Sequence, residues 1–176
     1  MLKKWIIMGI ALLLAATGIV AALHLANQDD IGCMVILQGE QEIAVSFEDL
    51  DKYAFSGELT DGKGDVTFHE YTGILLRELL AGKGIDLAQV TGVTVTSADN
   101  YSVAFTGEEI LQADKVYVAI TVDGAKIEGI DPGSDGVQMI VFGDANSRRC
   151  VRFAQKIIIE QRTPKTEATR YPRDGR

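Results

Sequence analysis

The sequence is poor in the residues that bind transition metals. Its 176 residues include two cysteines and two histidines, and one of the histidines, His24, lies in an apolar N-terminal stretch. A zinc site built from cysteine and histidine requires more ligands than remain. A Ser-His-Asp hydrolase would have to use His69, which lies in an expected strand between Phe68 and Glu70. We interpret His69 as a packed or surface residue, so we expect neither chemistry.

Nucleotide-binding loops are also missing. The chain contains no complete Walker loop and no Gly-x-Gly-x-x-Gly after a strand. The segment "DPGSDG", residues 131–136, begins like an EF-hand calcium loop. Its third and twelfth positions are Gly133 and Phe142, where an EF-hand carries ligands, so the segment predicts a turn.

Positive charge is scarce. The chain holds 25 acidic and 17 basic residues, a formal net charge of −8. Seven of the basic residues lie near the two ends of the chain, so the part between them is more acidic than the whole. This charge argues against nucleic acid or an anionic lipid surface as the main partner. The exception is "GDANSRRCVRF", residues 143–153, which gathers three arginines.

The N-terminal segment predicts a membrane anchor. Residues Trp5 to Leu25 form an uncharged run of 21 residues, which as a helix spans roughly 30 Å, the thickness of a bilayer core. A cleaved signal peptide is the alternative, although its apolar region is normally shorter, about 7–15 residues. Lys3 and Lys4 precede the run and acidic residues follow it. We therefore expect an anchor over residues 1–26 in the cell membrane, crossing it once, with the remaining chain on the extracytoplasmic side.

The two cysteines allow two interpretations, and the C-terminal segment allows a prediction of disorder. In an oxidising compartment Cys33 and Cys150 form a disulfide if their backbones approach, and otherwise Cys150 is a small buried apolar residue. Both alternatives remain open. Residues 161–176 contain no aliphatic cluster and carry five basic and two acidic residues, which predicts a disordered polar tail.

The region 33–160 predicts one α+β domain with mixed β-sheets and short helices. Short apolar runs around turn residues predict strands near 34–45, 55–71, 90–105, 115–127, 137–142 and 149–160. Capping-box spacing predicts helices after Ser46, with Asp49, and after Thr106, with Glu109. A further helix is expected to begin at Thr72. Its apolar stripe consists of Ile74, Leu75, Leu79 and Leu80. Strands and helices do not alternate regularly, which argues against a doubly wound fold.

Four motifs in this order resemble the molybdopterin-binding oxidoreductase domain of the sulfite oxidase type, in its short stand-alone form. They are "HEYTGILLRELLAGKGID", "VTVTSADNYSVAFTGEEI", "VYVAITVDGAKI" and "GVQMIVFGDANSRRCVRFAQKIIIE". The resemblance covers residues 35–160. It implies mixed sheets around a pterin pocket and a cysteine thiolate that holds molybdenum.

The sequence departs from that family at the metal ligand. The resemblance implies the cysteine in the segment "GELTDGKGD", near Thr60 and Asp61, and this segment contains none. Cys33 precedes the first expected hairpin, and Cys150 stands where the family usually has an aromatic residue. The soft protein ligand for molybdenum is therefore missing, and we predict no metal site.

The arginine-rich segment supplies the candidate ligand-binding residues. In an expected final strand, Val151, Phe153, Ile157 and Ile159 face the core, and Cys150, Arg152 and Lys156 face the other side. Arg148 lies in the loop before that strand. A guanidinium in a loop suits bidentate binding of phosphate or carboxylate. The candidates are Arg148, Arg149, Asn146 and Ser147, and the resemblance adds Asp99 and Tyr101. For Arg148 a solvated surface role is an equal alternative, and for Asp99 and Tyr101 we favour a simple turn.

Two functions follow as hypotheses. The first is a membrane-tethered, non-catalytic domain that binds a pterin-like or other small anionic ligand, or a redox partner protein. The second is an oxidoreductase that holds the molybdenum cofactor, molybdopterin, without a protein thiolate. The missing cysteine favours the first.

Overall fold

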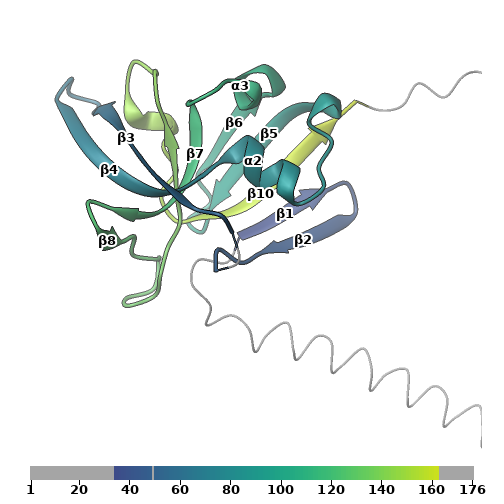
Figure 1. The fold of residues 1–176 in the computed structure, drawn as a ribbon, viewed down its shortest axis with the longest axis horizontal. Coiled ribbons are helices and arrows are strands. Elements are labelled where there is room, and N and C mark those ends of the chain that lie inside the picture. Colours follow the sequence, from purple (N-terminus) through teal and green to yellow (C-terminus); the bar gives the residue numbers. More distant parts are fainter. Residues whose placement is uncertain (1–33, 49, 163–176) are drawn as a thin grey trace, which may run out of the picture.

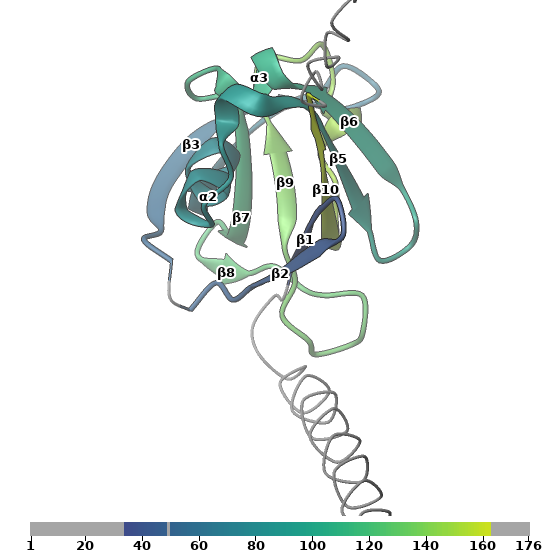
Figure 2. The ribbon, with the colours of Figure 1, turned by 90° about the vertical axis from the view of Figure 1, so that its right-hand side faces the viewer.

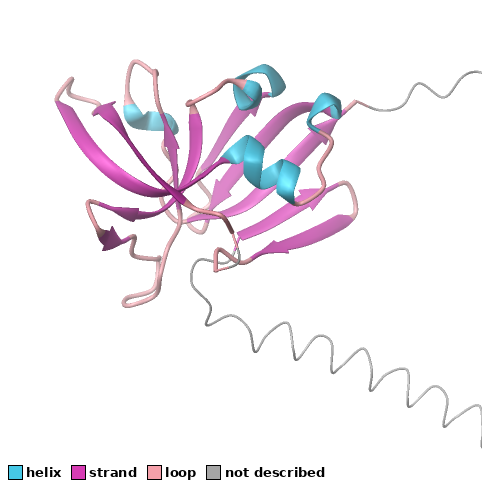
Figure 3. Ribbon diagram, viewed as in Figure 1, coloured by secondary structure: helices cyan, strands magenta, loops and turns pink. Residues whose placement is uncertain are grey.

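The chain folds into two β-sheets with short helices beside them (Figure 1, Figure 3). The computed structural model describes residues 34–48 and 50–162. The expected anchor, residues 1–26, and the tail beyond residue 162 lie outside the described residues. No helix within the described ranges is long and apolar enough to cross a membrane.

Sheet A combines both ends of the described chain. Its strands, in spatial order, are β2 (Gln41–Val45), β1 (Met34–Gln38), β10 (Ala154–Gln161), β5 (Val90–Ser97) and β6 (Ser102–Thr106). β1 and β10 are parallel, and the other pairs are antiparallel. This mixture confirms the predicted mixed sheet.

Sheet B is antiparallel and more strongly curved, with a long hairpin that projects from the body (Figure 1). Its strands are β3 (Tyr53–Thr60), β4 (Val66–Leu75), β7 (Val116–Val122) and β8 (Ala125–Lys126) in that order, and β9 (Gln138–Val141) also pairs with β7. The helical segments are α2 (Leu76–Gly82), α3 (Gly107–Leu111) and two 3₁₀ turns, η1 (Leu87–Gln89) and η2 (Ser147–Arg149). Figure 2 shows α2 beside β7 of sheet B, and α3 lies against β5 and β6 of sheet A.

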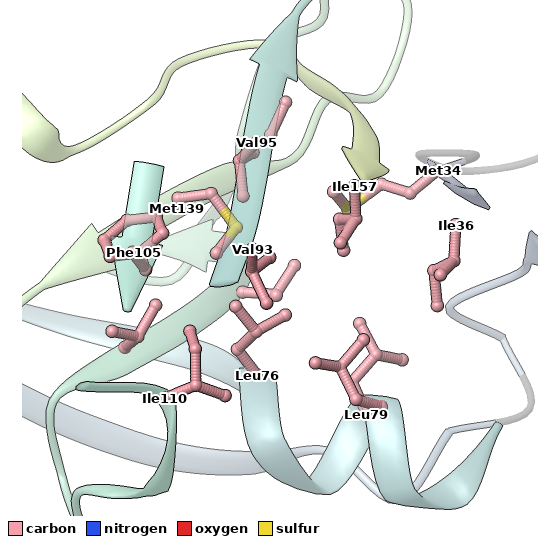
Figure 4. Close-up of a cluster of buried hydrophobic side chains, with 14 of the residues drawn as sticks. Met34, Ile36, Leu76, Leu79, Val93, Val95, Phe105, Ile110, Met139 and Ile157 are labelled. Atoms are coloured by element: carbon pink, nitrogen blue, oxygen red, sulfur yellow. The ribbon is translucent and has the colours of Figure 1, made fainter. Parts of the chain in front are cut away.

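The main core lies between the inner face of sheet A, α2 and one face of sheet B (Figure 4). Side chains alternate along the strands, so that every second residue of β5, β6 and β10 is buried. The fully buried members with the largest side chains include Phe47, Met34, Ile36, Leu76, Leu79, Leu80, Met139 and Ile157. A second cluster covers the other face of sheet B and contains Tyr71, Leu75, Tyr117, Ala119, Ile127 and Ile140. Around its strand β7, sheet B is therefore packed against buried side chains on both faces.

The helix expected at Thr72 begins later, at Leu76. Gly73, Ile74 and Leu75 continue strand β4 and pair with β7. The backbone N–H of Thr72 donates to the Thr121 hydroxyl, 3.1 Å away, so Thr72 belongs to the strand and caps no helix. The apolar stripe is buried as expected, but half of it belongs to the strand.

The prediction of a helix after Ser46 is wrong for the residues that the structure describes there. The chain forms bends or turns at Phe47, Glu48 and Leu50, and Asp49 lies outside the described residues. The Lys52 ammonium binds the carbonyl oxygens of Phe47, Glu48 and Leu50. These carbonyls are thus satisfied by a side chain in place of helical amides.

The final strand is shorter than expected. Residues 147–149 form η2, and β10 begins at Ala154. Phe153 adopts a positive φ of 54°, which breaks the extended conformation before the strand. Two orientations were consequently wrong: Phe153 is half-buried, and Cys150 packs against the core instead of sharing the exposed side of Arg152.

The capping box of α3 is confirmed. The Thr106 hydroxyl accepts from the Glu109 backbone N–H at 3.2 Å, and the Glu109 carboxylate accepts from the Thr106 N–H at 3.1 Å. The short helix is thereby fixed at its first turn.

Gly57 tests the packing of the second cluster. A Cβ at this position would lie 2.5 Å from the Phe142 ring. We expect Gly57→Ala to lower the free energy of unfolding by about 1–3 kcal/mol, because the ring must move out of a packed site. Gly62→Ala is the matched control, since nothing lies within 4 Å of its Cβ. Urea denaturation measures both, and equal effects would contradict the packing described.

Candidate functional site

The structure brings the six candidate ligand-binding residues together from two loops. One is the turn between β5 and β6, which holds Asp99 and Tyr101, and the other is the loop between β9 and β10, residues 142–153. The Tyr101 hydroxyl joins them by donating a 2.7 Å hydrogen bond to the carbonyl oxygen of Arg148. We call this pair of loops the arginine-loop site.

The β5–β6 turn is closed by the Asp99 carboxylate. It accepts from the Ser97 hydroxyl and, at 3.1 Å, from the backbone N–H of Tyr101. The Ser97 hydrogen bond, more than any other contact, lowers the pKa of Asp99. Asn100 carries the turn with a positive φ of 69°, a conformation that asparagine tolerates. Asp99 therefore holds the turn that positions Tyr101, as the simple-turn alternative expects.

The backbone of Arg148 is held from both sides. Its N–H donates to the Asn146 side-chain oxygen at 3.1 Å, and Asn146 caps the η2 turn by this bond. Its carbonyl oxygen accepts from Tyr101. The guanidinium itself is exposed, and it forms no ion pair with any residue that the structure describes. The half-buried Ser147 lies beside it. Arg148 is thus a cation on a fixed backbone that remains open to a ligand from solution.

Arg149 has a different environment. Its Nε and Nη2 donate to the two Asp144 carboxylate oxygens at 2.6 and 2.8 Å, a bidentate ion pair. Nη2 also donates to Glu109 Oε1 at 2.8 Å, and Lys115 lies 3.4 Å from the same oxygen. The guanidinium lies 5.3 Å from the centroid of the Phe105 ring. Arg149 therefore ties the loop to α3 with partners from its own chain.

This ion pair perturbs the pKa of Glu109 strongly. The hydrogen bond from Arg149 is the largest cause, and it outweighs partial burial to lower the pKa from 4.5 to about 2. The two carboxylates raise the pKa of Arg149 in return. Both carboxylates are about four-fifths buried, with exposed fractions of 20% for Glu109 and 17% for Asp144. Their charges are thus neutralised within the protein.

Sequence reasoning missed Asp144 and treated Glu109 as a helix cap alone. Asp144 precedes Arg149 by five residues, a spacing that no regular helix or strand brings into contact. Glu109 is distant in sequence from Arg149 and meets it only because α3 packs beside the loop. The capping box was the one signal available for Glu109, and it points to the backbone.

Cys150, in the β9–β10 loop, carries a half-buried thiol. Its sulfur accepts a 3.4 Å hydrogen bond from the Val141 N–H, and burial raises the pKa of the thiol. Tyr71 lies close by, and burial raises the pKa of its phenol to about 12. Both groups are thus held neutral near pH 7. Cys33, the partner in the disulfide alternative, lies outside the described residues.

The position implied for the molybdenum ligand does not fit a thiolate site. It lies at the tip of the β3–β4 hairpin, where the Asp61 carboxylate accepts from the backbone N–H groups of Lys63 at 2.7 Å and Asp65 at 3.0 Å. These bonds lower the pKa of Asp61 and close the turn. Thr60 is the last residue of β3. Within residues 34–48 and 50–162 no three His, Cys, Asp or Glu side chains are grouped to hold a metal ion.

His69 has a partner that the sequence did not indicate. Its Nδ1 lies 2.7 Å from Asp123, whose other carboxylate oxygen accepts from the Glu70 N–H at 3.0 Å. Asp123 occupies the β7–β8 turn with a positive φ of 50°. The pair joins that turn to the middle of β4.

A shallow groove of about 390 Å³ lies at the start of α3. Its lining residues are Val90, Thr91, Thr106, Gly107, Glu108 and Arg162. None of the six candidate residues lines this groove.

The fold has a counterpart among solved structures. It is similar to the sulfane dehydrogenase SoxCD from Paracoccus pantotrophus. The TM-score is 0.59 at 16% sequence identity, over 74% of this chain and 38% of that chain. The chain therefore spans less than half the length of the structure it matches. No family model and no curated protein matches the sequence.

This similarity concerns the fold. It supports the sulfite-oxidase-type architecture that the four motifs indicate, and it confirms the expected α+β class with mixed sheets. At this identity it assigns no ligand and no reaction to the chain. The roles of the six candidate residues remain predictions.

The Glu109–Arg149 ion pair predicts an acid-sensitive contribution to stability. A carboxyl group whose pKa is lowered on folding stabilises the protein above its unfolded pKa of 4.5, and this stabilisation is lost as the pH falls toward about 2. Glu109→Gln keeps the capping geometry but removes the titrating group. We expect the free energy of unfolding to fall less steeply between about pH 5 and pH 3 in the variant, as measured by urea denaturation. Parallel pH profiles would contradict the ion pair.

Proposed function

We propose that the chain is a membrane-tethered, non-catalytic domain that binds a small anionic ligand at the arginine-loop site. The tether is the apolar segment 1–26, and the folded domain lies on the extracytoplasmic side. The ligand class is a pterin-like compound or another small molecule that bears a carboxylate or phosphate. A redox partner protein that presents such a group would dock in the same way.

The exposed Arg148 guanidinium is the observation that carries this proposal. Its backbone is fixed by Tyr101 and Asn146, so a ligand does not have to order the loop when it binds. The neighbouring Arg149 is neutralised by Asp144 and Glu109, which leaves Arg148 as the cation of the η2 turn that can pair with an external anion. A planar guanidinium pairs with carboxylate or phosphate through two parallel hydrogen bonds.

The non-catalytic part of the proposal rests on the missing thiolate. Asp61 closes the turn at the position that the resemblance implies for a cysteine, and its carboxylate is committed to backbone amides. The Cys150 thiol lies in another loop, and burial raises its pKa, which disfavours the thiolate that a metal requires. No reaction step through molybdenum follows from these residues.

Binding of 6-carboxypterin, followed by its own fluorescence, tests the site. We expect Arg148→Ala to weaken binding by about ten- to a hundredfold, equivalent to about 1.5–3 kcal/mol, because a charge-assisted contact is lost. Arg152→Ala is the matched control. Arg152 is also exposed and lies in the same loop, but beyond η2, with its guanidinium 6.0 Å from the Phe153 ring centroid. Its loss should cost about 0–1 kcal/mol and fade with added salt. Equal, small and salt-sensitive losses would mean that all these arginines are solvated surface charges.

Intact cells test the tether, and protein purified from its native membrane tests the absence of catalysis. We expect protease added to intact cells to digest the domain, because it lies outside the cytoplasm. Elemental and pterin analysis should find no stoichiometric molybdenum. Protection of the domain until lysis would reverse the topology, and one molybdenum per chain would favour the oxidoreductase hypothesis.

A further inference from the structure

The outer face of sheet A carries aliphatic, small and hydroxyl side chains with few charges, and the described chain does not cover it. The side chains that alternate with the core residues point outward from its five strands, and all are exposed or half-buried. Ile158 lies at the centre, on β10, with 37% of its surface exposed. Its strand-to-strand neighbours are Leu37 on β1 and Thr94 on β5, and Ala104 on β6 follows Thr94. We call this surface the outer A face.

A second row of small or β-branched side chains lies beside the first. By register it contains Ala44, Val35, Lys156, Thr96 and Ser102. Side chains of this size produce the even surface on which two sheets pack, at about 10 Å between backbones. Lys156 is the charged residue of this row, and Thr96 and Ser102 are polar without charge.

The charges on β10 are arranged symmetrically about Ile158. Lys156 precedes it by two residues and Glu160 follows it by two, so both lie on the same face, each roughly 7 Å from Ile158 along the strand. Neither forms an ion pair with a described residue. The Glu160 carboxylate lies across Gly92 of β5, where a Cβ would be 2.8 Å from its oxygen.

We propose that the outer A face binds the same face of a second copy of this chain. A two-fold axis that crosses the strands at Ile158 reverses the direction of β10 in the second copy. Lys156 of each copy then lies over Glu160 of the other, which forms two equivalent ion pairs, and the Ile158 side chains meet at the axis. The Glu42 residues of the two copies would face each other, but they lie on the edge strand β2, at the solvated rim of the interface.

The size of the face indicates a reversible dimer. Five strands at about 4.8 Å and five residues at about 3.3 Å give roughly 400 Å² of flat area per copy. Stable complexes bury about 800 Å² per partner, so the dimer should be weak and dependent on concentration. The two ion pairs specify the register more than they add affinity.

The other exposed apolar surface does not fit a second copy. Val66 and Phe68 of β4 are exposed by 57% and 61%. On the same face lie Glu58, which pairs with Phe68 across the hairpin, and Glu70. Neither strand of this hairpin contains a lysine or arginine. Two copies that met here would bring carboxylates together.

Charge exchange tests the dimer in the full-length chain, kept in a mild detergent and studied by sedimentation velocity over a range of concentrations. We expect Lys156→Glu and Glu160→Lys each to raise the dissociation constant about tenfold or more, because each places like charges opposite one another. The double variant Lys156→Glu/Glu160→Lys should restore dimerisation, since both ion pairs return with reversed sign. Lys63→Glu, at the exposed hairpin tip, is the control for net charge and should change nothing.

Restoration in the double variant is the decisive result, because a variant that merely fails to fold is not rescued by a second charge reversal. A monomer at every concentration would overturn the proposal. A dimer whose dissociation constant is unchanged by both single reversals would also overturn it, because such a dimer would form through another surface or through the N-terminal segment. Loss without restoration would mean that Lys156 and Glu160 do not face each other.

Discussion

The position of β10 in the middle of sheet A is the constraint on which the rest of the structure depends. This last strand pairs with β1, the first, in parallel and with β5 in antiparallel orientation. Its inner side chains, Ile157 and Ile159, fill the core, and its outer ones form the centre of the outer A face. The loop that precedes it must therefore cross from β9 in sheet B to the centre of sheet A. That crossing places the arginine-loop site at the junction of the two sheets.

The ion pairs of Arg149 stabilise this crossing loop. Backbone hydrogen bonds hold the end of the loop, where Val151 pairs with Met139. Side chains hold the part before it: Asn146 caps η2, Tyr101 binds the Arg148 carbonyl, and Asp144 and Glu109 bind Arg149. Two adjacent arginines thereby acquire opposite roles. The Arg149 guanidinium holds the loop in place. The Arg148 guanidinium faces solvent, on a backbone that a ligand does not have to order.

The strands could be predicted from alternating apolar residues because their inner faces are buried, and the Thr106 capping box was visible because it is local. The predictions failed where distant residues decide. Thr72 and the residues after it continue as a strand because β7 pairs with them, and no local pattern records this. After Ser46, by contrast, the contact is local, since Lys52 binds three carbonyls within the preceding five residues, but the capping-box spacing does not record it. In the candidate site, the sequence indicated the arginines but not which of them meets a carboxylate, since that depends on how α3 packs.

The parallel pairing of β1 with β10 also has a mechanical consequence. The described chain enters at the start of β1 and leaves at the end of β10, and parallel strands place these two points at opposite ends of the ladder. A force that pulls them apart is directed along the strands, so it loads the hydrogen bonds between residues 35–38 and 156–159 in shear, all at once. Shear of this kind requires the whole ladder to fail together, whereas an antiparallel pair pulled from its adjacent ends opens one bond at a time. Sheet A is thus built to resist tension along the chain.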